Sequence, residues 1–248
     1  QLTGNKCTIS GFQIVNGCQT SNVLFNSRDS FDAEKVLVPI KLVSTQDEEI
    51  VNEIIRATNS QNAVKPEELE AMTEFQKKLE HYFRTYTGQG QLHYERRSKQ
   101  WVASTVEKTR IVTIPNQIKA FASMFLAVPH RVAGYYGTVR ARMQNQIFRN
   151  DHRPIAYYTS ALALYRLEGL FRNKSLDATW KPLKWYLLML FARSAGGPPP
   201  DAASKECEKY CNAIIEILNE LNRAKDVFDG IVRAITARGL PEMNKDTV

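Results

Sequence analysis

Residues 12–21, FQIVNGCQTS, predict a strand, a sharp turn and the start of a helix. The apolar run ends at Asn16 and Gly17, which tolerate the backbone conformations of a tight turn. The first N–H groups of a helix have no partner within it, so they form a seat for phosphate or another anion. Gln19 and Thr20 add hydrogen-bonding side chains beside that seat. We therefore predict that these four residues bind a ligand; the alternative is a purely structural turn with a helix cap.

A second amide-rich cluster, ATNSQNAV, occupies residues 57–64. Asn and Gln amides can pair with adenine edges or hold a backbone phosphate. Thr58, Asn59, Gln61 and Asn62 are therefore predicted to bind the same ligand. The alternative is a helix C-terminus, where polar side chains satisfy spare carbonyl groups.

Tyr94-Glu95-Arg96-Arg97 combines an aromatic ring, a carboxylate and two guanidinium groups. Alternation on a strand places Tyr94 and Arg96 on one face and the other two residues on the opposite face. Because Arg grips phosphate and Tyr stacks on bases, Tyr94, Arg96 and Arg97 are predicted to bind the ligand. Glu95 and His93 are candidates for a general acid or base, but no catalytic residue is assigned. One carboxylate is too few for a nuclease metal, so the pattern favours a salt bridge from Glu95 to an Arg.

The succession of IVNGCQTSN, ATNSQNAV and YERRSKQW resembles the abortive-infection phage-resistance (AIPR) proteins of prokaryotic antiviral defence. The later segments IPNQIKAF and IFRNDHRPIAYY also fit, so the resemblance covers residues 1–165. Family members carry an Asn-Asn-Gly-rich segment upstream of the first motif, and this chain opens on Gln1 without it. We expect the chain to be a piece of a longer protein, with part of the family's site upstream.

The first turn is also similar to the Asp-Gly-Gln turn of ParB-like and sulfiredoxin-like proteins, some of which bind nucleotides or DNA with it. Here Asn16 stands for the Asp and Thr20 for an Arg. The loss of the carboxylate and the guanidinium argues against hydrolysis at this turn.

The charge of the chain is unevenly distributed. Its formal net charge is +7, but residues 84–153 hold 12 basic and 3 acidic side chains, a net charge of +9. Residues 1–83 carry −4 and residues 154–248 carry +2. Four aromatic residues are interleaved with the central cations: Tyr94, Trp101, Tyr135 and Tyr136. This composition is typical of a nucleic-acid surface, although the cations could instead solvate different faces.

The composition also argues against several classes of site and partner. No apolar run approaches the roughly 20 residues that a membrane span needs, so no membrane partner is expected. Four cysteines do not make a disulfide scaffold. Cys207 and Cys211 fall on one apolar helix face, and the four histidines are scattered, so we predict neither a metal site nor a cofactor.

The pattern as a whole predicts an α+β, mostly helical fold. A small N-terminal α/β portion, residues 1–110, would continue upstream of this chain, and an all-helical portion would occupy residues 111–248. Strands are expected over Thr8–Val15 and Val36–Val43. A helix is expected over Gln19–Phe25, with Thr20 or Ser21 as its cap.

Later elements follow from turn and cap signals. Leu92–Arg96 and Gln100–Ser104 are predicted to form a hairpin. Beyond the Gly- and Pro-rich linker at residues 196–200, helices are predicted from Asp201 to Arg223 and from Asp226 to Arg238. First-turn prolines mark three further helix starts: Pro115, Pro154 and Pro182.

Three functional hypotheses follow. The first is a cytoplasmic defence protein that binds nucleic acid (DNA or RNA) or a nucleotide through an amide-rich cleft and a basic surface. The second is a nucleotide- or nucleic-acid-hydrolysing effector that uses the turn at residues 16–20 with Glu95 and Arg96 or Arg97. The third is a scaffold whose residues 155–248 dock a defence-system protein partner, such as a nuclease or ATPase subunit.

Overall fold

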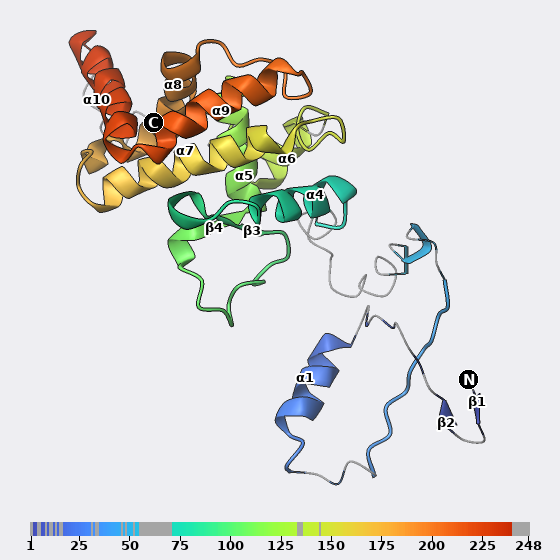
Figure 1. The fold of residues 1–248 in the computed structure, drawn as a ribbon. Helices are drawn as coiled ribbons and strands as arrows, with labels where there is room; N and C mark the ends of the chain where they lie inside the picture. Colours follow the sequence, from blue (N-terminus) through green and yellow to red (C-terminus); the bar gives the residue numbers. More distant parts are fainter. Residues whose placement is uncertain are drawn as a thin grey trace. The chain divides into compact units, whose positions relative to one another are not determined.

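The computed structural model describes residues 2–3, 6–7, 9, 12, 14, 17–30, 32, 35–45, 47, 49–51, 53–54, 71–132, 136–143 and 145–239. The chain forms two compact units, Gln1–Lys65 and Pro66–Val248. The predicted fold class is confirmed, because the described elements are mostly helices accompanied by a few short strands (Figure 1). The domain division at residue 110 stays a prediction.

In the first unit, strands β1 (Leu2–Thr3) and β2 (Lys6–Cys7) pair antiparallel. Helix α1 (Cys18–Asn26) confirms the helix predicted after the turn. Gly17 precedes it with φ +105°, a left-handed conformation that favours glycine. The predicted side-chain cap is wrong, because no side chain accepts a hydrogen bond at the start of α1.

The strand predicted over Val36–Val43 is also wrong. These residues have no regular secondary structure, and no strand among the described residues pairs with them. A strand needs a partner for its backbone groups, so apolar composition alone does not produce one. Apolar side chains in this segment are exposed, with Leu37 at 93% and Ile40 at 79% exposure. The strand predicted over Thr8–Val15 falls largely outside the described residues.

The second unit holds most of the described helices. They are α4 (Glu74–Phe83), α5 (Ile114–Met124), α6 (Tyr136–Met143), α7 (Pro154–Arg172), α8 (Lys184–Gly196), α9 (Glu206–Asn219) and α10 (Leu221–Ala237). Pro115 lies in the first turn of α5 and Pro154 opens α7, so both predicted helix starts are confirmed. Pro182 instead lies in a 3₁₀ turn just ahead of α8.

Helix α7 is the centre of this unit. It contacts α4, α5, α8, α9 and α10, and lies between α4 and α9 in Figure 1. Most of its side chains are buried around its whole circumference, as expected of a helix enclosed by others. Tyr157 stacks on Phe121 with ring centroids 4.1 Å apart, and Tyr158 stacks on Tyr86 at 3.5 Å. These aromatic contacts join α7 to α5 and to the chain that follows α4.

A short parallel sheet replaces the predicted hairpin. Strand β3 (His93–Glu95) pairs with β4 (Ile111–Thr113), so that Tyr94 lies opposite Val112. Residues 98–103 form turns instead of a second hairpin strand. Residues 111–113 pair with β3 in place of residues 100–104 because they can bury a side chain. Val112 is buried in the core, whereas Val102 is 75% exposed.

The last two helices begin at other residues than those predicted. Asp201 accepts from the N–H of Ala203 in a turn, and the hydroxyl of Ser204 accepts from the Cys207 N–H at the head of α9. Extended backbone at Glu220 separates α9 from α10. The expected apolar face is confirmed, since Cys207 and Cys211 are both buried.

Gly90 provides a test of the packing between α7 and the chain before β3. A Cβ atom added there would lie 2.7 Å from the hydroxyl oxygen of buried Tyr158, which donates to the Gly90 carbonyl at 2.6 Å. Gly90→Ala should lower the free energy of unfolding by about 1–3 kcal/mol, measured by urea denaturation. The matched change Gly230→Ala, inside α10 with open space around it, should raise it by about 0.5–1 kcal/mol. Equal stability of the two variants would contradict this packing.

Candidate functional site

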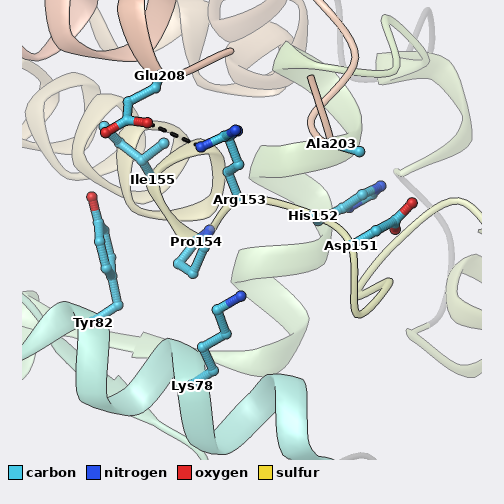
Figure 2. Close-up of a pocket in the computed structure, with 9 residues that line it drawn as sticks. All are labelled: Lys78, Tyr82, Asp151, His152, Arg153, Pro154, Ile155, Ala203 and Glu208. Carbon is cyan, nitrogen blue, oxygen red and sulfur yellow. Dashed lines mark hydrogen bonds and ion pairs between the residues drawn. The ribbon is translucent and has the colours of Figure 1, made fainter. Parts of the chain in front are cut away.

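Two cavities lie along residues 145–155, the segment that leads into α7. The first, of about 340 Å³, is walled on one side by Lys78 and Tyr82 of α4 and on the other by residues 151–155 (Figure 2). The second, of about 480 Å³, is walled by the start of α4 and by residues 145–150. From the sequence, Pro154 is predicted to start a helix, and Arg149 and Arg153 belong to the basic segment, but no ligand contact is predicted for the residues of either cavity.

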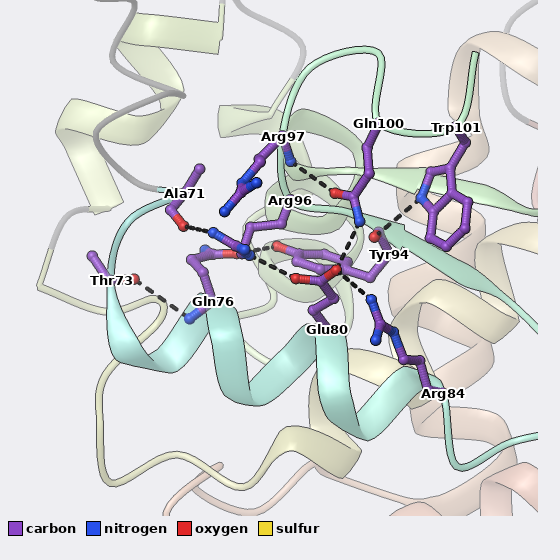
Figure 3. A network of polar contacts seen from close by, with 10 residues as sticks. All are labelled: Ala71, Thr73, Gln76, Glu80, Arg84, Tyr94, Arg96, Arg97, Gln100 and Trp101. Atoms are coloured by element: carbon purple, nitrogen blue, oxygen red, sulfur yellow. Dashed lines mark hydrogen bonds and ion pairs between the residues drawn. The ribbon is translucent and has the colours of Figure 1, made fainter. Parts of the chain in front are cut away.

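The carboxylate of Glu80 on α4 organises the predicted YERR motif (Figure 3). It accepts hydrogen bonds from Arg96 Nε at 2.7 Å, Gln100 Nε2 at 2.7 Å and an Arg84 guanidinium nitrogen at 2.8 Å. Burial raises the pKa of Glu80, but the hydrogen bonds from Arg96 and Gln100 and the charges of Arg96 and Arg84 outweigh it. The pKa of Glu80 therefore lies below its ordinary value.

Arg96 is committed to this network. Its side chain is 13% exposed, and a second guanidinium nitrogen donates to the Ala71 carbonyl at 2.7 Å. Two of its guanidinium nitrogens are therefore used by acceptors of the protein. In this structure Arg96 links the end of β3 to α4, and its contact with a ligand stays a prediction.

Tyr94 belongs to the core. It is 1% exposed, its hydroxyl donates to Gln76 of α4, and its ring lies 5.2 Å from that of Phe83. Stacking on a base needs an open ring face, which Tyr94 lacks here. Tyr94 and Arg96 both contact α4, as strand alternation predicts.

The remaining residues of the motif are more accessible. Arg97 is exposed, and its side chain has no ion pair among the described residues, so it stays a predicted ligand contact. The salt bridge predicted for Glu95 is wrong, because Glu80 supplies the carboxylate on Arg96. His93 packs edge-on against Trp101 at 5.1 Å; burial and the charge of Arg110 lower its pKa. No group of three or more His, Cys, Asp or Glu in the described part of the chain is placed to hold a metal.

The structure describes few of the residues predicted to bind a ligand in the two amide clusters. Asn16, Thr58, Asn59, Gln61 and Asn62 lie outside the described residues, and so does the side chain of Gln19. Gly17 and Thr20 are described, and Thr20 is exposed in the first turn of α1. Their convergence into one cleft stays a prediction.

Three guanidinium groups surround Tyr165 of α7, and we call these four residues the Tyr165 cluster. The Cζ atoms of Arg110, Arg166 and Arg172 lie 5.3, 5.5 and 5.6 Å from the centre of its ring. Arg110 pairs with Glu107 at 3.2 Å, and buried Arg166 donates to main-chain carbonyls. Arg172 has no ion pair within 4 Å in the described structure. Spacing in the sequence did not indicate this cluster, because Arg110 reaches α7 only through the β3–β4 pairing.

The connection between β3 and β4 carries further cations. It projects from the helices of the second unit in Figure 1. Arg97 and Lys99 are exposed at its beginning and Lys108 at its end, and none of them pairs with a carboxylate in the described structure. Arg172 of α7 is exposed as well, and these four cations are the residues of the basic surface proposed below.

Comparisons with known proteins bear on the whole chain. A family model described as AIPR protein matches residues 2–235. No curated protein and no solved structure matches the chain. Within the described residues, no helix has both the length and the apolar character that crossing a membrane requires.

The ionisation of Glu80 predicts a pH dependence of stability. Because its folded pKa lies below the ordinary value of 4.5, the charged carboxylate stabilises the fold at neutral pH. This contribution disappears as the pH falls from above 4.5 through the lower folded pKa. Glu80→Gln should cost about 2 kcal/mol at pH 7 in urea denaturation and should make stability less sensitive to acid.

Glu220→Gln is the control, because the ion pair of Glu220 with Arg223 is exposed and should contribute little. A Glu80→Gln variant with wild-type stability at pH 7, or with an unchanged loss of stability in acid, would contradict the role given to this carboxylate.

Proposed function

The chain belongs to the AIPR protein family, and on that premise we propose that it binds nucleic acid through the basic surface of its second unit. Family membership supports an abortive-infection phage-resistance role. The binding proposal goes further and rests on the cations described above. The one observation that carries it is the convergence of three guanidinium groups on Tyr165, of which only Arg110 is paired with a carboxylate, that of Glu107, in the described structure.

The charge balance of this region supports an anionic partner. Arg110 and Arg166 hold main-chain carbonyls of the turn before β3, so they also have structural roles. Arg172 keeps its charge for a ligand, and Arg97, Lys99 and Lys108 extend the excess of positive charge along the β3–β4 connection. A polymer with regularly spaced phosphates can contact several such groups at once and release its counterions.

Phosphate contacts of this kind position a nucleic acid without reading its sequence. Direct reading would fall to groups that reach base edges, and the amide clusters of the first unit stay the predicted candidates. Trp101, half-buried within the connection, follows Lys99 by two residues. We therefore expect the basic surface to supply affinity and little specificity.

The two alternatives stay predictions. Hydrolysis would need Glu95 to act with the turn at residues 16–20. Arg96, the other residue of that hypothesis, donates to Glu80 in this structure. The scaffold hypothesis needs a partner for residues 155–248. The described residues of that segment form a continuous packed core with α4 and α5, which neither requires nor excludes a partner.

Salt dependence tests the proposal. The triple variant Arg97→Gln/Lys99→Gln/Lys108→Gln should bind single-stranded and duplex oligonucleotides more weakly at low salt. The slope of log affinity against log salt concentration should become shallower by about 2–3, because each lost phosphate contact removes roughly 0.7–0.9. Fluorescence anisotropy over a salt series measures both quantities.

The matched control Lys205→Gln/Lys209→Gln/Arg233→Gln removes the same net charge from exposed positions on and beside α9 and α10. It should leave the slope almost unchanged. Equal losses in the two triple variants, or no binding of either nucleic acid by the wild-type protein at low salt, would overturn the proposal.

A further inference from the structure

The smaller cavity beside α7 has the size of a small-molecule site. Its volume of about 340 Å³ falls at the lower end of the range for ligand pockets, roughly 300–1,000 Å³. Such a space suits a mononucleotide or one end of a polymer better than a length of polymer. Figure 2 shows Lys78 and Tyr82 rising from α4 toward Pro154, with the ion pair of Arg153 and Glu208 at the far wall.

The charges around this cavity leave one ammonium group without a partner. Glu208 pairs with Arg153 at 3.0 Å, and Asp151 is held by Arg149. Lys78 forms no ion pair within the described structure, and its Nζ lies 6.0 Å from the ring centre of Phe75. The carboxylates of the wall are therefore already neutralised, whereas Lys78 is available to an anion.

The head of α7 adds positive potential to the same wall. This helix is 19 residues long, has no acidic residue in its first turn and receives no side-chain cap. Arg153 occupies the N-cap position, where Ser, Thr, Asp or Asn normally satisfies the free N–H groups. The N–H of Ile155, another residue of the wall, makes no hydrogen bond to backbone or side chain of the described structure. A local rule of helix capping is broken here, as happens at binding sites.

A buried polar group also lines the cavity. His152 is 4% exposed, and its Nδ1 lies 2.9 Å from the Tyr157 hydroxyl. Its Nε2 has no hydrogen-bond partner among the described residues. Burial, with the charge of Arg149, lowers the pKa of His152, so the ring is neutral at pH 7 and can accept or donate. The ring is fixed among Phe75, Phe121 and Tyr157, so this wall of the cavity is rigid.

We propose that this cavity binds a phosphate monoester, with the phosphate held by Lys78 and the N-terminal end of α7. Lysine binds phosphate groups as a point charge, and the free N–H of Ile155 and the dipole of the helix favour the same anion. The phosphate belongs either to a free mononucleotide or to the 5′ end of a nucleic acid. This site uses none of the residues of the basic surface, so it does not rest on the proposed function.

Isothermal titration of the full chain tests the site. Adenosine 5′-monophosphate and inorganic phosphate should bind, and adenosine should not. Lys78→Gln should weaken the binding of adenosine 5′-monophosphate at least about tenfold, since it removes a charged hydrogen bond. Lys78→Arg should keep most of the affinity, and the control Lys209→Gln should match the wild type. Thermal melting of each variant confirms that a loss of binding is not a loss of folding.

To identify the source of the phosphate, the binding of oligonucleotides with and without a 5′-phosphate is compared. If the 5′-phosphorylated oligonucleotide gains affinity that Lys78→Gln abolishes, the site holds a nucleic-acid end. If only adenosine 5′-monophosphate depends on Lys78, the site holds a free nucleotide. Equal binding of adenosine and its monophosphate, or wild-type affinity in Lys78→Gln, overturns the proposal. The triple variant of the basic surface should still bind adenosine 5′-monophosphate, so the two proposals fail independently.

Discussion

The hydrogen bonds to the carboxylate of Glu80 hold α4, β3 and the turn after β3 together. This carboxylate lies on α4 and accepts from Arg96, directly after β3, from Gln100 in the following turn and from Arg84 at the C-terminal end of α4. A half-buried carboxylate with three donors is stable only if those donors stay in place. Together with the contacts of Tyr94 with Gln76 and Phe83, this group holds β3 against α4 and so fixes where the β3–β4 connection begins.

This constraint divides the charged residues between structure and function. Arg96 serves the network, whereas Arg97, one residue later, is exposed and forms no ion pair in the described structure. The pairing of β3 with β4 then brings Arg110 back to α7 and into the Tyr165 cluster. The excess of cations between residues 84 and 153 is thus partly structural, and the share left for phosphate is smaller than the sequence suggests.

Local signals in the sequence predicted local structure well. The helix after Gly17, the proline-headed starts of α5 and α7 and the apolar face of α9 each depend on neighbouring residues alone. The predicted hairpin is wrong because Tyr94 pairs with Val112, which lies further along the chain than the predicted partner strand at residues 100–104. Val112 is buried in the core, and local sequence signals do not reveal such a partner. The strand at residues 36–43 failed because an apolar run cannot supply its own backbone partner. The Tyr165 cluster and the phosphate cavity join segments that are distant in sequence, so no spacing could have indicated them.

Arg96 stabilises the fold through Glu80, whereas ligand binding by its neighbour Arg97 is a proposal. A double-mutant cycle with Glu80→Gln and Arg96→Gln, followed by urea denaturation, tests the role of Arg96 most directly. We expect a coupling energy of about 1–3 kcal/mol between the two changes. Additive effects, with Arg96→Gln as stable as the wild type but deficient in nucleic-acid binding, would contradict it.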